Sequence, residues 1–363
     1  MILHIFNPEH DLALAGNRNG FTAPHAARAL RSDLGYIPAL WASPGDFILV
    51  ENKEYADKAF RKLNAKLGYI GKSAERNFVN FIEADELCRC DIEGIDPWGW
   101  DTALCNMLLR KGIDRKWLPG LEILSSIRML SHRSASAGIL SGLTDIYGTI
   151  GKSSVCVSEK DIAGKVAEYG RAVIKAPWSC SGRGVRFVDR QSFPVLSGWI
   201  RNTLKKQDAL MVEPYYRKVK DFGMEFFSYG DGRVGYCGLS LFCASNGAYT
   251  GSLLATENVK LEVLKRYISV DLLDSVRRRI CELLGRQLAG CYRGPLGIDM
   301  MVVNNEADGG FLLHPCVEIN LRRTMGHVAL SLSPDDDDIR KIMRITIQDN
   351  YRLKINNLTT KKL

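Results

Sequence analysis

Two strand-like segments decide the fold: Gly297-Ile-Asp-Met-Met-Val-Val303 and Phe311-Leu-Leu-His-Pro-Cys-Val-Glu-Ile-Asn320. A short turn between them would form a β-hairpin in which Asp299 faces Glu318 directly. Asn320 would share that face, because side chains alternate along a strand with a period of two. Carboxylate and amide oxygens suit Mg²⁺ or Mn²⁺, and two facing acids repel each other without a cation. The hairpin therefore predicts a metal site.

Two arginines follow the hairpin at once, in Leu321-Arg-Arg-Thr-Met-Gly-His327. Guanidinium groups form forked hydrogen bonds with phosphate and carboxylate groups. A basic pair at the surface is the commoner role for such a sequence. The position of Arg322 and Arg323 beside the predicted acids favours anion binding.

A lysine lies inside the apolar strand that opens Ala172-Val-Ile-Lys-Ala-Pro-Trp-Ser-Cys-Ser-Gly-Arg-Gly-Val185. An unpaired ammonium group is costly in such surroundings. The loop that follows, Ser179 to Gly184, exposes backbone amides that could cradle phosphate oxygens. An ordinary hairpin whose lysine reaches the surface explains the segment equally well.

A kinked linker separates the strands Met211-Val-Glu-Pro-Tyr-Tyr216 and Lys220-Asp-Phe-Gly-Met-Glu-Phe-Phe227. Such a hinge exposes backbone groups that can bind an adenine edge, and a nearby carboxylate can accept ribose hydroxyls. The acids near it are Glu213, Asp221 and Glu225. Taken alone, solvated surface acids are the more common interpretation.

Together these segments resemble the ATP-grasp superfamily over roughly residues 125–330. Val317-Glu-Ile-Asn-Leu-Arg322 is similar to the family's Glu-Ile-Asn-Pro-Arg segment, with Leu321 in place of proline. The resemblance implies that ATP and Mg²⁺ (or Mn²⁺) bind between two subdomains. The implied metal ligands are Asp299, Glu318 and Asn320, and the implied phosphate ligands are Lys175, Arg322 and, less securely aligned, Arg133. The other implied nucleotide contacts are Ser181, Gly182 and Gly184 in a flap, Glu213 and Tyr216 at the adenine hinge, and Asp221 on the ribose.

The pattern of elements predicts an α/β part followed by an α+β part. Before about residue 120, helix-like and strand-like patches alternate, which favours a parallel sheet. After about residue 170, strands come in pairs with Gly-rich turns between them. The resemblance then implies four segments: a Rossmann-like pre-ATP-grasp domain (1–124), a small ATP-grasp subdomain (125–209), a large subdomain (210–350) and a polar tail (351–363).

The composition is that of a soluble globular chain. Its 363 residues carry a net charge of +8, with basic residues scattered along the sequence, which argues against nucleic acid as a partner. No apolar run is long enough for a membrane span, and the start lacks the features of a secretion signal. We therefore expect a cytoplasmic protein with ten reduced cysteines and small-molecule partners. A homodimer is left open.

Other familiar sites are excluded by their spacing. Two Gly-Lys-Ser triplets, 71–73 and 151–153, lack the glycine that a P-loop needs five positions earlier. No glycine-rich dinucleotide fingerprint follows the first strand. Cys88-Arg-Cys90 has no second cysteine pair with which to form a zinc site.

The resemblance implies an ADP-forming ligase that joins a carboxylate to an amine or thiol through an acylphosphate. In that interpretation Lys175, Arg322 and Arg323 are the catalytic cations. Two alternatives stay open: an ATP-grasp phosphotransferase acting on a hydroxyl, and a nucleotide-binding regulator without catalysis. Neither substrate can be named from the sequence.

The segment Asn7-Pro-Glu-His-Asp11 follows the first predicted strand, and ligands gather beyond the carboxyl ends of strands in α/β sheets. Glu9 and Asp11 could orient an amine substrate, and His10 could accept its proton near neutral pH. A helix N-terminus capped by Asn7 uses the same residue types and is an equally good interpretation.

Overall fold

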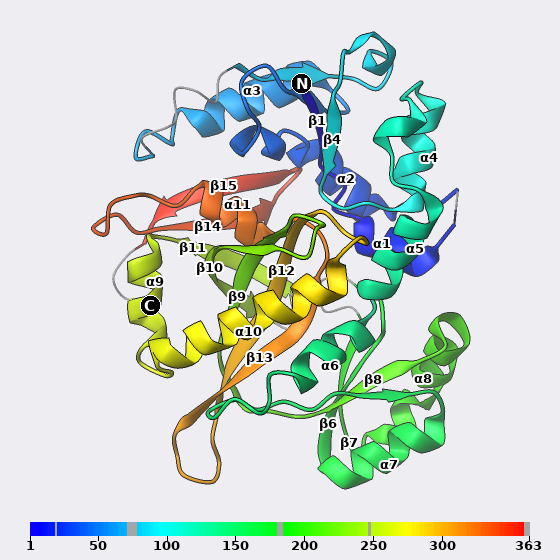
Figure 1. The fold of residues 1–363 in the computed structure, drawn as a ribbon, viewed down its shortest axis with the longest axis vertical. Coiled ribbons are helices and arrows are strands. Elements are labelled where there is room, and N and C mark those ends of the chain that lie inside the picture. The colour runs from blue at the N-terminus through cyan, green and yellow to red at the C-terminus, as the bar shows by residue number, and fades with distance from the viewer. Residues whose placement is uncertain (19, 71–77, 180–183, 246–247, 359–363) are drawn as a thin grey trace.

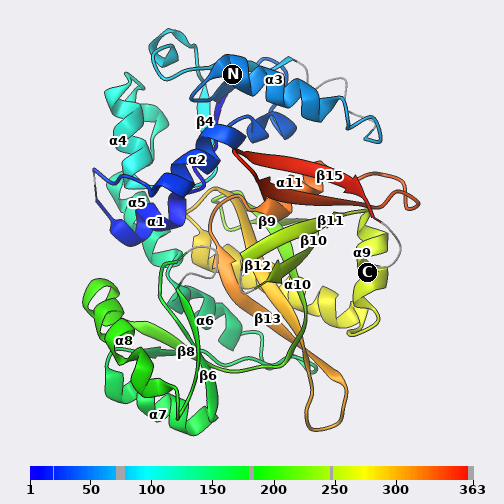
Figure 2. The same cartoon turned by 180° about the vertical axis from the view of Figure 1, so that it is seen from behind.

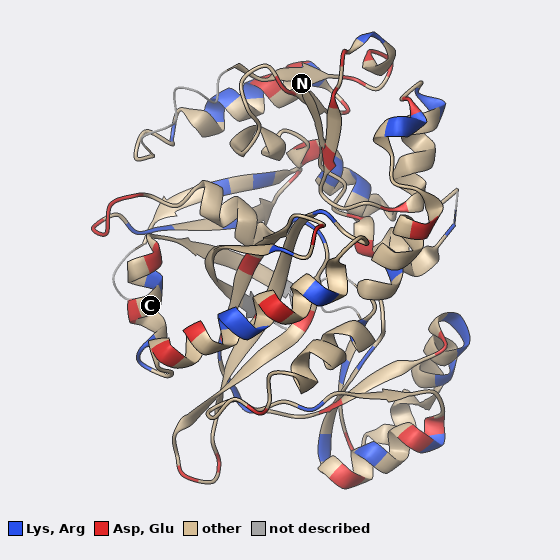
Figure 3. Ribbon diagram, in the orientation of Figure 1, with Lys and Arg blue, Asp and Glu red and all other residues tan. Residues whose placement is uncertain are grey.

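The structure is a computed structural model that describes residues 1–18, 20–70, 78–179, 184–245 and 248–358. The strands in these residues form three sheets. Figure 1 shows the N-terminal sheet at the top, a large sheet in the middle and a small sheet at the lower right. Basic and acidic residues are interspersed over all three parts (Figure 3). No helix in the described part of the chain is long and apolar enough to cross a membrane.

The N-terminal sheet is parallel throughout, with the strand order β3-β2-β1-β4. Its strands are β1 (Ile2–Ile5), β2 (Phe47–Leu49), β3 (Asn80–Ile82) and β4 (Gly94–Pro97). The helices described here are α1 (His10–Gly16), α2 (His25–Leu34), α3 (Lys53–Asn64) and α4 (Thr102–Arg110). Asn52 and Asp101 cap α3 and α4 by accepting a backbone hydrogen bond. The predicted parallel α/β layer is present.

Short 3-10 helices and two α-helices connect this layer to the rest of the chain. The 3-10 helices are η1 (Ile37–Leu40), η3 (Leu87–Arg89) and η4 (Arg115–Trp117). The α-helices are α5 (Leu121–Leu130) and α6 (Arg133–Ser141). Helix α5 runs continuously across residue 124, where the first predicted segment ends.

The small sheet is antiparallel, with the order β5-β8-β6-β7. Its elements are β5 (Ser154–Cys156), α7 (Glu159–Tyr169), β6 (Arg171–Lys175), β7 (Val185–Asp189), α8 (Phe193–Gln207) and β8 (Leu210–Pro214). Both helices pack on it around a separate core that includes Ile162, Ile200 and Val212. The sheet therefore extends to Pro214, and the boundary predicted at residue 209 is too early. Sequence alone could not show that the backbone of β8 pairs with β6.

The large sheet has the order β13-β12-β9-β10-β11-β14-β15. Its strands are β9 (Lys218–Ser228), β10 (Val234–Ser245), β11 (Ala248–Leu254), β12 (Gly294–Asn304), β13 (Phe311–Asn320), β14 (Lys341–Ile347) and β15 (Tyr351–Asn357). The helices of this part are α9 (Glu257–Leu264), α10 (Val270–Leu288) and α11 (Met325–Ser331). In Figure 1, α10 lies in front of the strands. It packs with them into the largest core.

The prediction of a polar tail from residue 351 is wrong for β15. Tyr351, Leu353 and Ile355 alternate with polar residues, and Leu353 is only 7% exposed. Leu353 belongs to a core that also contains Ile48 of β2 and Val328 of α11. Figure 2 shows β14 and β15 beside the N-terminal part. The N-terminal layer and the large sheet thus share one core. Residues 359–363 lie outside the described residues.

Candidate functional site

The predicted pair of facing acids lies on adjacent strands of the large sheet. Asp299 of β12 pairs with Glu318 of β13. The turn from Asn304 to Phe311 is longer than the short turn expected, and a register shift just after Asp299 offsets the difference. Asn320 Nδ2 donates a hydrogen bond of 3.2 Å to Asp299 Oδ2. The two acids and the amide are therefore neighbours.

Asp299 lies among other acids and is half-buried. Burial, together with the charges of Glu318 and Glu225, raises the pKa of Asp299 to about 7. Glu225 lies on β9 opposite Gly297 and is 4% exposed. Its carboxylate accepts a hydrogen bond of 2.8 Å from Thr324 Oγ1. Sequence analysis grouped Glu225 with linker acids and missed this position. The period of two along β9, which places Asp221, Gly223 and Glu225 on one face, could have found it.

Arg133, the first residue of α6, binds the second acid. Its Nη2 donates to both carboxylate oxygens of Glu318, each at 2.8 Å. Its Nη1 donates a hydrogen bond of 2.7 Å to Oγ of Ser179, a residue that follows β6. Helix α6 is held against β13 by a hydrogen bond of 2.9 Å from the Ile319 amide to Ser136 Oγ. Arg133 is 5% exposed and connects the acid pair to the small sheet.

Lys175, the last residue of β6, has the anionic partner that its apolar strand requires. Its Nζ lies 2.6 Å from Glu213 Oε2 on β8, and both side chains are less than 10% exposed. Glu213 Oε1 also accepts a hydrogen bond of 3.2 Å from Ser153 Oγ. Ser153 belongs to the triplet Gly151-Lys-Ser153, which lacks the spacing of a P-loop. This triplet therefore contributes a hydrogen bond to Glu213. Cys316 on β13 is within electrostatic range of this pair and of the acid pair.

The loop after β6 is described only at its two ends. Ser181 and Gly182, expected in a flap, lie outside the described residues. The Gly184 carbonyl accepts a hydrogen bond of 2.8 Å from the Ala176 amide, which closes the loop. A Cβ at Gly184 would lie 2.5 Å from Ser179, so a larger residue would disrupt this closure.

Two further predicted nucleotide contacts are Tyr216, in the linker between β8 and β9, and Asp221, within β9. The Tyr216 ring meets the buried His314 ring edge to face, with centroids 5.5 Å apart. Burial and the charge of Lys175 lower the pKa of His314 to about 3, which keeps this ring neutral. Asp221, at the start of β9, is paired with Lys218 at 2.6 Å.

The chain is similar to solved structures over nearly its whole length. A protein of Archaeoglobus fulgidus assigned to the ATP-grasp superfamily matches with a TM-score of 0.50 and 13% identity, covering 99% of this chain and 100% of that one. The biotin carboxylase domain of Hydrogenobacter thermophilus 2-oxoglutarate carboxylase, solved with MgADP and bicarbonate, gives 0.53 and 11%, covering 95% and 74%. The chain has the ATP-grasp fold.

A third ATP-grasp structure agrees with these two. Phosphoribosylamine–glycine ligase of Thermotoga maritima matches with a TM-score of 0.52 and 12% identity, covering 95% of this chain and 80% of that one. No family model matches the sequence, and no curated protein matches it. The resemblance seen in the sequence is therefore confirmed through the fold.

The two arginines after β13 bind acids of the N-terminal layer. Arg322 forms a fork with Asp11, with Nη2 2.7 Å and Nε 2.9 Å from its carboxylate oxygens. Burial alone would raise the pKa of Asp11, but Arg322 and His10 lower it below its usual range. Arg323 donates to Asp96 at 2.8 Å and stacks over Trp41 at 4.3 Å. These ion pairs hold the N-terminal layer against the segment that follows β13.

In the Asn7–Asp11 segment, Asp11 pairs with Arg322 of the large sheet region, whereas His10 and Asn7 form hydrogen bonds within the N-terminal layer. His10 is 0% exposed, with its ring nitrogens 3.2 Å from Asp11 and 3.0 Å from the Trp100 carbonyl. Both ring nitrogens of His10 are thus engaged within the N-terminal layer, and its role as acceptor of a substrate proton stays a prediction. Asn7 does not cap α1, which begins at His10. Its side chain instead donates to the Gly99 carbonyl at 2.8 Å.

The acid pair and Asn320 have the donor chemistry for a divalent cation, but arginines bind the oxygens of Glu318 and Asn320. Within the described residues, no group of three or more His, Cys, Asp or Glu side chains is placed to hold a metal ion. The set that fits Mg²⁺ is Asp299, Glu318 and the Asn320 amide oxygen. Arg322 Nη2 donates to that amide oxygen at 3.0 Å, and Arg133 holds Glu318. A bound cation would therefore have to displace Arg322 from the Asn320 oxygen and Arg133 from the Glu318 carboxylate.

Proposed function

We propose that the protein is an ATP-dependent ligase that activates a carboxylate as an acylphosphate. The observation that supports this most is the set of three cations at and around the acid pair within an ATP-grasp fold. Arg133 binds Glu318, Arg322 binds the Asn320 amide oxygen, and Lys175 binds Glu213. Of the similar structures, one holds MgADP and bicarbonate, and another is a carboxylate–amine ligase by name. The amine and thiol classes of nucleophile share this first step.

The proposed nucleotide site lies between the small and the large sheet, the two parts that we assign as ATP-grasp subdomains. Lys175 and Arg133 would bind phosphate oxygens, and each would exchange a carboxylate partner for them. The linker with Tyr216 would hold the adenine, together with Glu213, and Asp221 would accept the ribose hydroxyls. The loop containing Ser181, Gly182 and Gly184 would cover the phosphates.

Asp299, Glu318 and Asn320 would hold Mg²⁺, which neutralises charge on the phosphates when bound. Arg322 and Arg323 would orient the substrate carboxylate by forked hydrogen bonds. A carboxylate oxygen attacks the γ-phosphorus of ATP, the bond to the β-phosphate oxygen breaks, and ADP leaves. The nucleophile then attacks the acyl carbon, loses its proton and displaces phosphate. Positioning and charge neutralisation suffice for the first step, so no nucleophilic side chain is needed.

The test is an ADP-formation screen of the full chain with Mg-ATP and pooled carboxylic acids, run with and without hydroxylamine. An acylphosphate reacts with hydroxylamine to give a hydroxamate, so the proposal predicts acid-dependent ADP together with hydroxamate. A phosphate ester as the product would instead identify a phosphotransferase. No acid-dependent ADP, in a protein that binds Mg-ATP, would contradict the ligase.

A further inference from the structure

Arg133 lies between a predicted cation ligand and the loop after β6. Its Nη2 donates to both oxygens of Glu318, each at 2.8 Å. Its Nη1 donates to the Ala176 carbonyl and, at 2.7 Å, to Ser179 Oγ. One guanidinium group therefore joins the acid pair to the base of the loop that would cover the phosphates.

The position of this guanidinium group is the one that a cation on Glu318 would take. Equal distances to the two carboxylate oxygens place Nη2 between them, where a metal ion bound by both oxygens would also lie. Positive charges so close together repel each other strongly. Arg133 and a divalent cation therefore compete for Glu318.

The backbone of Arg133 is fixed beside the acid pair. Its amide donates to the Pro177 carbonyl at 3.2 Å, and helix α6 is tied to β13 by the hydrogen bond from the Ile319 amide to Ser136 Oγ. Only the side chain can move, and at 5% exposure it needs an anion wherever it goes. Arg133 should therefore leave Glu318 only when another anion replaces the carboxylate.

The other two cations of the site do not compete in this way. Lys175 pairs with Glu213, which is not among the predicted cation ligands. Arg322 reaches those ligands at the neutral amide oxygen of Asn320. Of these three cations, only Arg133 pairs with a carboxylate of the predicted cation site within the described residues.

We propose that Arg133 blocks the cation site while no nucleotide is bound. Its side chain occupies Glu318 in the free protein, and phosphate oxygens draw it away when the nucleotide binds. A divalent cation then reaches Glu318 only together with the nucleotide or after it. That the displacing anion is a nucleotide rests on the ligase function proposed above. The competition between Arg133 and a cation does not depend on that function.

The experiment measures Mn²⁺ binding to the full chain without nucleotide, from the loss of the electron paramagnetic resonance signal of free Mn²⁺. Hydrogen bonds to a charged group correspond to about tenfold to a hundredfold in affinity. Arg133→Gln removes those that compete for Glu318, so it should bind Mn²⁺ tighter than the wild type by that factor. Equal affinities of the two folded proteins would overturn the proposal.

Arg128→Gln is the matched control. It removes the same charge from the neighbouring helix α5, but Arg128 donates to the Leu14 carbonyl and stacks over Trp178, away from the acids of the cation site. Its Mn²⁺ affinity should differ from that of the wild type by less than about threefold, as for other weakly coupled charges. A gain as large as that of Arg133→Gln would reduce the effect to net charge and contradict the block.

Glu318→Gln, alone and combined with Arg133→Gln, shows where Mn²⁺ binds. The double variant should lose the gain, and a gain that persists would place the ion elsewhere and contradict the proposal. Alone, Glu318→Gln should leave the weak binding of the wild type unchanged, because Arg133 already occupies this carboxylate. A tenfold loss would show that Glu318 is open to cations in the wild type. This single variant decides the question if Arg133→Gln does not fold.

A parallel Mg-ATP titration and ADP assay of the wild type separate this proposal from the ligase. A gain in Mn²⁺ affinity, in a protein that does not bind Mg-ATP, supports the block and removes the proposed function. Acid-dependent ADP formation without any gain in Arg133→Gln removes the block and leaves the ligase.

Discussion

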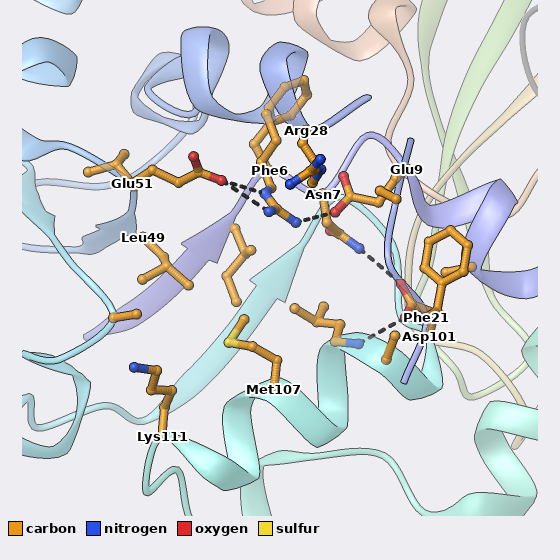
Figure 4. Close-up of a pocket in the computed structure, with 18 of the residues that line it drawn as sticks. Phe6, Asn7, Glu9, Phe21, Arg28, Leu49, Glu51, Asp101, Met107 and Lys111 are labelled. Carbon is orange, nitrogen blue, oxygen red and sulfur yellow. Dashed lines mark hydrogen bonds and ion pairs between the residues drawn. The ribbon is translucent and has the colours of Figure 1, made fainter. Parts of the chain in front are cut away.

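The acids at and around the Asp299–Glu318 pair of the large sheet differ from Glu9, which lines a cavity of about 610 Å³ at the carboxyl edge of the N-terminal sheet (Figure 4), in how their oxygens are satisfied. At the acid pair, Glu318 is bound by Arg133, and the neighbouring Glu213 is bound by Lys175. At the cavity, Glu9 keeps one oxygen without a partner in the described residues. A site of paired charges can accept a polyanion and a cation by exchanging partners. A buried acceptor without a partner instead lowers the stability of the folded protein.

The largest effect is expected when one partner of a buried pair is removed. Lys175→Met leaves the Glu213 carboxylate buried without its cation, and the free energy of unfolding should fall by about 3–5 kcal/mol. Replacing both residues, with Lys175→Met and Glu213→Leu, should restore most of it, because no buried charge then remains. Urea denaturation of the two variants and the wild type measures this. A single variant as stable as the wild type would show that the pair is not buried.

Substitutions in the acid pair should reduce turnover more than they weaken nucleotide binding. Glu318→Gln and Asp299→Asn keep the side-chain shape and remove the charge that would hold a cation at the transferring phosphate. Each should reduce ADP formation by about 10²–10³-fold and weaken ATP binding by less than tenfold, as for other contacts formed in a transition state. Steady-state ADP assays and calorimetry separate the two effects. Glu306→Gln, on the exposed turn of the same hairpin, should behave as the wild type.

Sequence patterns predicted those parts of the site that depend on one hairpin. Asp299 faces Glu318 as expected. The turn of the hairpin is longer than expected, and a register shift between Asp299 and Met301 compensates for the extra length. Pairs of residues that are distant along the chain could not be predicted from the sequence, because only the folded sheets bring Arg133 to Glu318. The same holds for Lys175 and Glu213.

Burial was the other property that the sequence could not show. His10 looked like a reactive imidazole, but the backbone approaches so closely that a Cβ on Gly99 would lie 2.6 Å from its ring. Leu353 looked like part of a tail, because β15 is short and its outward residues are polar. Its contact with the N-terminal core depends on tertiary packing between distant segments.

The cavity acid should respond much less to neutralisation than the paired acids. Glu9→Gln removes a charge whose burial is unfavourable, and Arg31 keeps Glu51 as a partner. The free energy of unfolding at pH 7 should change by less than about 1 kcal/mol. Urea denaturation measures it beside Glu213→Gln, which should lose about 3 kcal/mol or more. Similar losses in both variants would remove the contrast between the two sites.

The smallest expected effect is a pH dependence. Because burial raises the pKa of Glu9, the folded protein binds this proton more tightly than the unfolded chain does. The resulting stabilisation is present below the unfolded pKa and is lost as pH rises through the higher folded pKa. The stability of the wild type relative to Glu9→Gln should therefore fall as pH rises above the ordinary pKa of 4.5. A difference that rises over this range would mean that Arg31 dominates over burial.

The most direct test of the account is whether Mg-ATP stabilises the full chain. Only the folded protein brings the small and large sheets together, so a nucleotide bound between them must raise the free energy of unfolding. At one hundred times its dissociation constant, Mg-ATP should add about 2.7 kcal/mol, and the doubly substituted Lys175→Met, Glu213→Leu protein should require about tenfold to a hundredfold more nucleotide for the same gain. No stabilisation of the wild type at millimolar Mg-ATP would contradict the account.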